Sequence, residues 1–111
     1  MTTLEIFEKV NLSIPMEQRI FFNFFEDTVN ELQSLYRDFV FIADKTYTPP
    51  TSLTDENVVL PLYHNSIVDN ILFLANQGEE YKGEFIRKSK DAFLKYWNEN
   101  ARGRRKRRMR W

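Results

Sequence analysis

The sequence of 111 residues contains no cysteine, a single histidine and only three glycines. Without cysteine the chain can form no disulfide and offers no thiolate as a metal ligand or nucleophile. The glycines stand alone at positions 78, 83 and 103, so there is no glycine-rich phosphate loop. No apolar run reaches the length of a membrane-spanning helix. The N-terminus carries acids early, and we expect no signal peptide.

The titratable residues form no recognisable catalytic or metal-binding pattern. A metal site at His64 would need further nitrogen or sulfur ligands at a set spacing, and the sequence offers none. The adjacent acids Glu26-Asp27 and Glu79-Glu80 would point about 100° apart on a helix, so they do not converge for acid–base catalysis. We therefore expect His64 to be a hydrogen-bonded core or interface residue, and the protein to be no enzyme and to need no metal or cofactor.

Residues 101–111 contain no acidic residue, and residues 1–100 are short of basic ones. The whole sequence has 16 basic and 16 acidic residues. Seven of the bases lie in residues 101–111, so the other nine face all 16 acids in residues 1–100, which carry a net charge of −7. Such asymmetry is typical of a folded domain with an interaction tail. We predict one domain over residues 1–100 and an extended basic C-terminal arm over 101–111, disordered until it binds.

Apolar periodicity predicts an all-α fold of three or four helices. Thr2 and Glu5 have the spacing of a capping box, which indicates a first helix to about Val10. Pro15 opens the second segment, residues 16–40, whose apolar residues fill an unusually broad side of a helix. An apolar arc of that width indicates that the helix packs against two surfaces at once, for instance the subunit's own core and a neighbouring subunit.

Two further helices are expected in the second half of the chain. One covers residues 62–77, begins after Pro61 and ends at Gly78, which is expected to be its C-terminal cap. The last helix covers residues 79–100 and has an apolar and a charged side. The basic arm follows it directly, with Gly103 as the expected hinge.

Residues 40–60 lose the helical period and are expected to form an extended loop or a short hairpin. Loops of this length are uncommon in small domains and are often functional. The segment is β-prone and aromatic, and its proline pair excludes a helix. Solvent exposure explains such a composition poorly. We therefore predict a subunit interface formed by Phe41, Tyr47, Pro49 and Pro50.

The ending ARGRRKRRMRW is the strongest functional feature of the sequence. Such a basic segment can bind a nucleic acid backbone, an acidic protein or an acidic groove on an identical subunit. Met109 and Trp111 supply apolar anchors that solubility or phosphate binding alone would not require. Arginine outnumbers lysine six to one, and its planar fork suits carboxylates as well as phosphates. A protein target is therefore favoured over DNA. The predicted partner-binding residues are Arg102, Arg104, Arg105, Lys106, Arg107, Arg108, Met109, Arg110 and Trp111.

Residues 60–97, LPLYHNSIVDNILFLANQGEEYKGEFIRKSKDAFLKYW, resemble the small head-to-tail connector (adaptor) proteins of tailed bacteriophages. In that family a Pro-led helix of the type LPxYHxxIVxxxLxLA packs against a helix carrying YxxxFxxKxxxAxxKYW. With the order of the elements, the resemblance covers about residues 20–100. The positions that it carries over as packing residues are Pro61, Tyr63, His64, Tyr81, Phe85, Ala92, Tyr96 and Trp97.

The resemblance implies a structural virion protein with no catalytic residue. Members of the family form dodecameric rings that dock under the portal, and their C-terminal segments take part in docking. We therefore expect a ring in the virion neck, between the portal protein and a downstream tail or neck protein, assembled in the host cytoplasm. DNA would pass the acidic lumen without specific binding, and no membrane is involved.

Two other functions remain open from the sequence. One is a small nucleic-acid-binding protein that uses the arm, whose affinity would fall by about 0.9 in log K per phosphate contact and per decade of salt. The net charge of residues 1–100 would oppose such binding, and the helices show no basic recognition face. The other is a free helical regulator.

Overall fold

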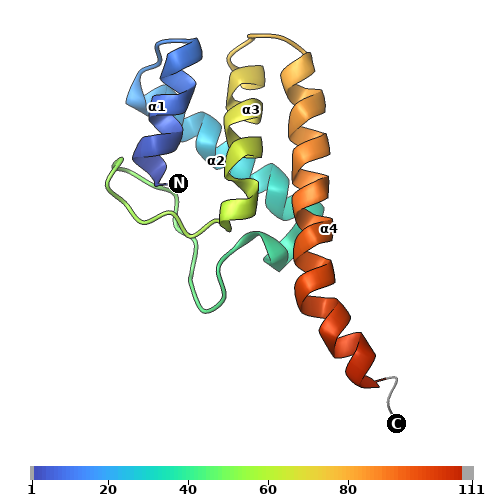
Figure 1. Ribbon diagram of the computed structural model, residues 1–111. Coiled ribbons are helices and arrows are strands. Elements are labelled where there is room, and N and C mark those ends of the chain that lie inside the picture. The colour runs from blue at the N-terminus through green and yellow to red at the C-terminus, as the bar shows by residue number, and fades with distance from the viewer. Residues whose placement is uncertain (1, 109–111) are drawn as a thin grey trace.

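The computed structural model describes the backbone of residues 2–108 and the side chains of residues 2–37 and 39–99 (Figure 1). Its described residues contain helices, one isolated β-bridge and no β-strand. The all-α prediction is therefore confirmed. The elements are α1 (Thr3–Ser13), α2 (Gln18–Tyr36), the 3-10 turns η1 (Arg37–Val40) and η2 (Pro61–Tyr63), α3 (His64–Leu74) and α4 (Glu80–Arg108).

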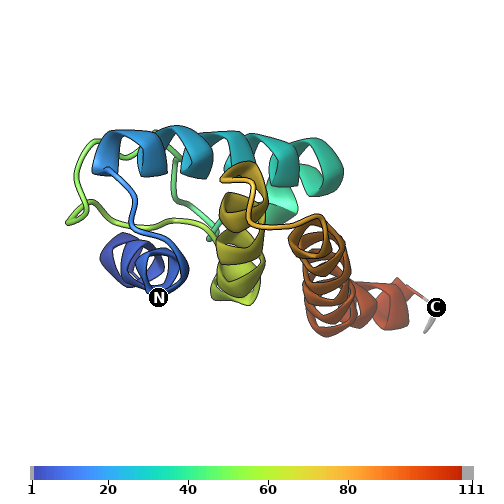
Figure 2. The ribbon, with the colours of Figure 1, turned by 90° about the horizontal axis from the view of Figure 1, so that it is seen from above.

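The helices form two layers. Figures 1 and 2 show α1, α3 and α4 side by side in one layer, while α2 crosses behind them. The central helix is α3, which contacts all three others. None of the described helices is long and apolar enough to span a membrane.

The core lies between the two layers. The apolar side of α2 that faces α1, α3 and α4 supplies Phe21, Phe25 and Leu32, all at most 1% exposed. Ile67 and Ile71 of α3 are fully buried against it. The edges of the broad apolar arc remain more open, because Ile20, Leu35 and, beyond the end of α2, Phe39 are 37%, 53% and 37% exposed.

The start of α1 follows the predicted capping box. The Glu5 amide donates to Thr2 Oγ1 at 3.1 Å, and the Thr2 amide donates to Glu5 Oε1 at 3.3 Å. The helix continues past Val10 to Ser13. The Asn11 side-chain amide donates to the Phe7 carbonyl at 2.8 Å, and its Oδ1 accepts from the Met16 amide at 2.9 Å. These bonds close the last turn from within the helix.

The end of α3 corrects the predicted C-terminal cap. The helix ends at Leu74, and Asn76, not Gly78, takes the left-handed conformation, with φ 61°. The Asn76 amide donates to the Phe73 carbonyl at 2.9 Å, and the Gln77 amide reaches the Leu72 carbonyl at 3.1 Å. This is the hydrogen-bond pattern of a Schellman motif, which asparagine tolerates nearly as well as glycine.

The last helix, α4, begins at Glu80 and its backbone is helical as far as Arg108. It therefore continues beyond the expected end at Asn100 and through Gly103, the expected hinge. Arginine and lysine favour the helix, and one glycine costs only about 1 kcal/mol, which explains the continuation. The side chains after Glu99 and all of residues 109–111 lie outside the described part of the chain.

Residues 41–60 form the expected extended loop, closed at its base like a short hairpin. Phe41 and Val59 form an antiparallel bridge. The Ile42 amide donates to the Val58 carbonyl, and the Leu60 amide to the Val40 carbonyl, each at 2.8 Å. The two ends of the loop are therefore tied together. The middle part of the loop lies beside α1 (Figure 1).

Candidate functional site

An aromatic surface lies where the end of α2 and the turn η1 meet the second half of α4. We define it as Phe39, Phe93, Tyr96 and Trp97. The Phe39 ring contacts Phe93 and Trp97 edge-on, with centroids 5.9 and 5.6 Å apart, and Tyr96 at 6.1 Å. Edge-on and offset arrangements are those that aromatic pairs prefer. The surface is thus an ordered cluster whose outer members remain open to solvent.

Local geometry explains why these rings meet. Phe93 and Trp97 are four residues apart on α4 and share one face. Arg37 ends α2 with φ 54° and ψ −130°, a conformation rare for a residue with a side chain. The chain therefore turns sharply, and the following 3-10 turn brings Phe39 against α4.

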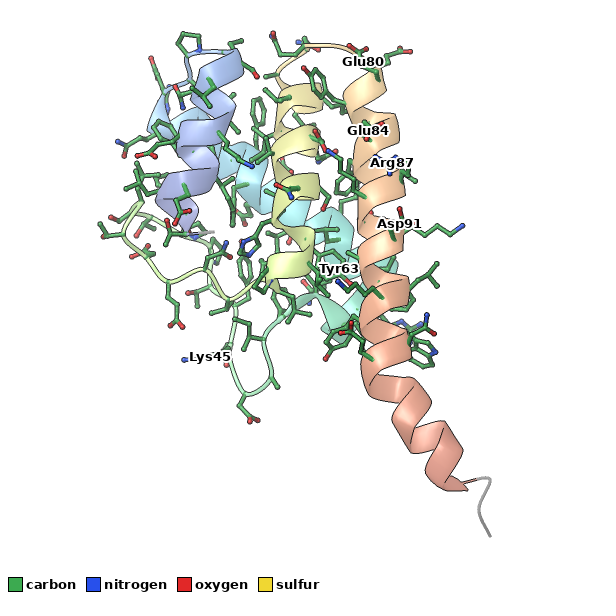
Figure 3. All side chains as sticks on the ribbon, viewed as in Figure 1. Lys45, Tyr63, Glu80, Glu84, Arg87 and Asp91 are labelled. Atoms are coloured by element: carbon green, nitrogen blue, oxygen red, sulfur yellow. The ribbon has the colours of Figure 1, made fainter. Side chains whose placement is uncertain are left out.

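The inner side of this cluster belongs to the core. Tyr36 stacks on Phe93 at 5.0 Å and on Tyr63 at 5.8 Å between centroids. The Tyr36 hydroxyl lies 3.0 Å from Ser89 Oγ. Tyr63 is fully buried between the start of α3 and α4 (Figure 3), and burial raises the pKa of its phenol well above the usual range. Tyr63 is therefore a neutral packing group, and packing is the role that the resemblance predicts for it.

The outer side of the cluster is exposed apolar surface beside the basic sequence. Trp97 is 41% exposed and Phe39 is 37% exposed. Leu35 and Leu94, on the same two helices, are 53% and 46% exposed. Large exposed apolar groups on neighbouring elements indicate an interaction site. Because α4 continues from Trp97 directly into the arginine-rich segment, apolar and basic chemistry adjoin here.

His64 is the hydrogen-bonded core residue that the sequence predicted. It is 4% exposed, and its Nε2 lies 2.8 Å from the Val59 carbonyl and 3.2 Å from Asn57 Nδ2. A carbonyl only accepts, so Nε2 carries the proton in this contact. Burial is the main reason that the pKa of His64 is lowered. The imidazole joins the start of α3 to the end of the loop.

The acidic pairs noted in the sequence do not converge. Glu79 and Glu80 are exposed at the start of α4, while Glu26 lies half-buried on α2. Burial, with Glu26 as a further cause, raises the pKa of Tyr47 to about 12. Within the described residues, no three His, Cys, Asp or Glu side chains gather as metal ligands. That the protein is no enzyme stays a prediction.

The charged face of α4 carries its own ion pairs. Glu84, Arg87 and Asp91 follow one another along the helix (Figure 3). Arg87 lies 2.5 Å from Glu84 and 3.7 Å from Asp91. All three side chains are at least 44% exposed, so these ion pairs lie at the surface. The neighbouring Lys88 pairs with Asp69 of α3 at 2.7 Å. This face is occupied by structural pairs.

The loop residues predicted as a subunit interface mostly have partners within the subunit. Phe41 stacks on Tyr47 at 5.3 Å with an interplanar angle of 18°, and both pack against the core. Pro50 is buried, and Pro49 is exposed. Three of the four side chains are therefore covered, at least in part, by contacts within the subunit. Their contact with another subunit stays a prediction.

The predicted partner-binding arm is only partly described. The backbone of α4 covers it as far as Arg108, while the side chains of Arg102–Arg108 and all of Met109–Trp111 lie outside the described residues. Sequence reasoning missed the exposed pair Phe39 and Trp97 beside the arm. The breadth of the apolar arc over residues 16–40 was the available signal.

Comparison of the chain with protein-family models, with curated proteins and with solved structures finds no match.

Proposed function

We propose that the protein is a structural component of a phage virion that forms a ring at the neck, between portal and tail, and docks through its C-terminal arm. The resemblance of residues 60–97 suggests the class of protein. The observation that carries the proposal is the aromatic surface with its exposed Trp97 at the base of the basic segment. Tryptophan and arginine are the residues most enriched among interface anchors.

The two chemistries serve different parts of docking. Fixing the long basic side chains of the arm costs up to about 2 kcal/mol each in rotamer freedom. Exposed ion pairs contribute less than about 1 kcal/mol each, so arginines alone cannot offset this cost. An adjoining apolar surface that becomes buried in the same contact supplies the remainder. A portal surface with carboxylates around an apolar pocket would fit both parts.

The charge of residues 1–100 suits a ring around DNA. A net charge of −7 on each domain repels phosphates and leaves the lumen without specific contacts. In such a ring the loop of residues 41–60 would meet the neighbouring copy through its exposed side, where Pro49 lies. The protein would reside in the virion, after assembly in the host cytoplasm.

A nucleic-acid-binding protein is the second candidate, and the seven bases of the arm favour it. In that case the arm would neutralise phosphates, and affinity would depend steeply on salt. Exposed Trp97 and Phe39 would then have to stack on unpaired bases, since a duplex offers them no open ring face.

The test is docking to the cognate portal protein, measured by light scattering after size exclusion and by surface binding. Truncation after Asn100 is expected to leave a folded helical domain, checked by circular dichroism, that no longer docks. Replacing the six arginines of the arm by lysine should weaken docking at equal charge. Undiminished portal binding by the truncated chain would refute docking through the arm, and tight DNA binding without portal binding would favour the second candidate.

A further inference from the structure

A groove of about 630 Å³ lies between the first turn of α1 and the turn of the loop around residues 53–57. Leu4, which is 40% exposed, and Leu53 give it an apolar lining. Carboxylates from both walls stand around that lining. They belong to Glu5, Asp55 and Glu56.

Hydrogen bonds fix the two walls of the groove in place. The Thr3 hydroxyl, on a residue that is 1% exposed, donates to the Asp55 carbonyl at 3.4 Å and ties the two walls together. Asp55 Oδ2 accepts from the amides of Thr51 and Ser52 at 2.9 and 3.0 Å. These backbone bonds lower the pKa of the Asp55 carboxyl, which stays charged. Glu5 is fixed by the capping box.

Acidic charge prevails at this site. Lys45 pairs with Glu56 at 3.4 Å and offsets one of the three carboxylates. A matching ligand is a peptide that carries both arginines and large apolar side chains. Phosphates would be repelled.

We propose that this groove receives the C-terminal arm of a second copy of the chain. The segment ARGRRKRRMRW combines seven bases with Met109 and Trp111, the two chemistries that the groove complements. Arginine forks pair with carboxylates in two parallel hydrogen bonds, and the indole suits a pocket between Leu4 and Leu53. A cation would make no use of the leucines, and the carboxylates would repel the phosphates of a nucleic acid or a lipid surface.

The acceptor must be another copy because of where the two parts lie. In Figures 1 and 2, α1 and the end of α4 stand on opposite sides of α3, and the end of α4 runs away from α1, which carries one wall of the groove. Arm-to-groove contact between copies is therefore head-to-tail, a geometry that closes into a ring or continues as a filament. The inference rests on the proposed ring and makes the neighbouring copy the acceptor of the arm before the portal is bound.

A peptide titration tests the contact directly. A fluorescein-labelled peptide of residues 101–111 is titrated with the full-length chain, and binding is followed by fluorescence anisotropy. The groove variant is Glu5→Gln/Asp55→Asn/Glu56→Gln, which removes three charges but keeps the acceptors of the capping box and of the turn. The matched control is Asp27→Asn/Glu79→Gln/Asp91→Asn, three exposed carboxylates on other surfaces.

The groove variant should bind the peptide about tenfold more weakly or worse, while the control stays within about twofold of the natural chain. Trp111→Ala in the peptide should weaken binding at equal charge, and a scrambled peptide should bind more weakly than the natural order. Equal losses in groove and control variants, or no saturable binding at millimolar peptide, would overturn the inference. Because no portal protein is present, this result is independent of the portal-docking test of the proposed function.

Discussion

Lys82 on α4 forms an ion pair with Glu31 on α2 and so ties the front layer of helices to the helix behind it. The same ammonium group donates to Asn70 Oδ1 on α3 at 3.1 Å and lies 4.8 Å from the centre of the Phe85 ring. Asn70, in turn, donates to Thr28 Oγ1 at 2.9 Å. One lysine therefore links three helices through hydrogen bonds and a cation–π contact.

Lys82→Ala should lower the free energy of unfolding by about 2 kcal/mol, because it leaves Asn70 and Glu31 without their shared donor. Arg87→Ala is the comparison, since Arg87 pairs with Glu84 and Asp91 on the exposed face of the same helix. That change should cost less than about 0.5 kcal/mol. Urea denaturation at 25 °C measures both. Equal losses would show that the three-helix link adds nothing beyond a surface ion pair.

The two glycines around the start of α4 should respond to alanine in opposite directions. Gly83 is exposed within the helix, and a Cβ there would meet nothing within 4 Å, so Gly83→Ala should stabilise the protein by about 1 kcal/mol. Gly78 has φ 144°, a backbone conformation that residues with a side chain rarely adopt, and a Cβ would also displace the end of the Glu80 side chain. Gly78→Ala should therefore destabilise by about 1–3 kcal/mol. Thermal unfolding of both variants decides, and a shared sign would contradict the prediction.

His64 should make the stability depend on pH near neutrality. Its folded pKa lies below the ordinary value of 6.5 because burial disfavours the charged form. As pH falls below 6.5, the unfolded chain therefore takes up a proton that the folded chain does not, and the free energy of unfolding decreases. Above that pH this contribution is fully present. His64→Gln should lose the dependence, because glutamine does not titrate.

The measurement is urea unfolding between about pH 5 and 7.5, with the natural chain and His64→Gln compared at each pH. Asp55 and Glu84 also have lowered pKa values, but they titrate below their ordinary values of 3.8 and 4.5, outside this window. Portal docking should be unchanged in the variant. Parallel pH curves would disprove the role of His64, and loss of biological function with intact assembly would reopen the question of catalysis.

Local signals in the sequence predicted the parts of the fold that depend on neighbours in the chain. Thr2 and Glu5 lie within one helical turn, so their spacing alone predicts the capping box that the structure contains. Asn76 was missed as a cap because glycine is the commoner residue there, and Gly78 stood two positions away. The helices themselves followed from apolar periodicity.

The features that the sequence could not reveal depend on contacts between residues that are far apart in the chain. Phe41 and Tyr47 were predicted to contact another subunit, and their packing within the subunit was missed because it depends on how the loop closes at Val59. The groove joins Leu4 to Leu53, nearly fifty positions apart, and no pattern in the sequence relates them. The basic arm, by contrast, was visible from composition alone.

The aromatic surface should separate stability from docking. Phe93 packs between Tyr36 and Phe39 and belongs to the partly buried shell of the core, so Phe93→Ala should destabilise by about 3 kcal/mol. Trp97 is 41% exposed and contacts Phe39 edge-on at 5.6 Å. Trp97→Ala should therefore cost only about 1 kcal/mol in unfolding free energy.

For portal binding, in contrast to stability, the effect of Trp97→Ala should be large. Exposed tryptophans at the base of a basic segment become anchors when a partner covers them, so Trp97→Ala should weaken portal binding by about tenfold or more while the chain stays folded. Leu12→Ala is the control, because Leu12 is 87% exposed on α1, on the far side of the molecule from α4 (Figures 1 and 2). Circular dichroism and urea unfolding first confirm that both variants are folded, and surface binding to the portal then ranks them. If Leu12→Ala and Trp97→Ala bind the portal equally well, the aromatic surface is not where the portal docks.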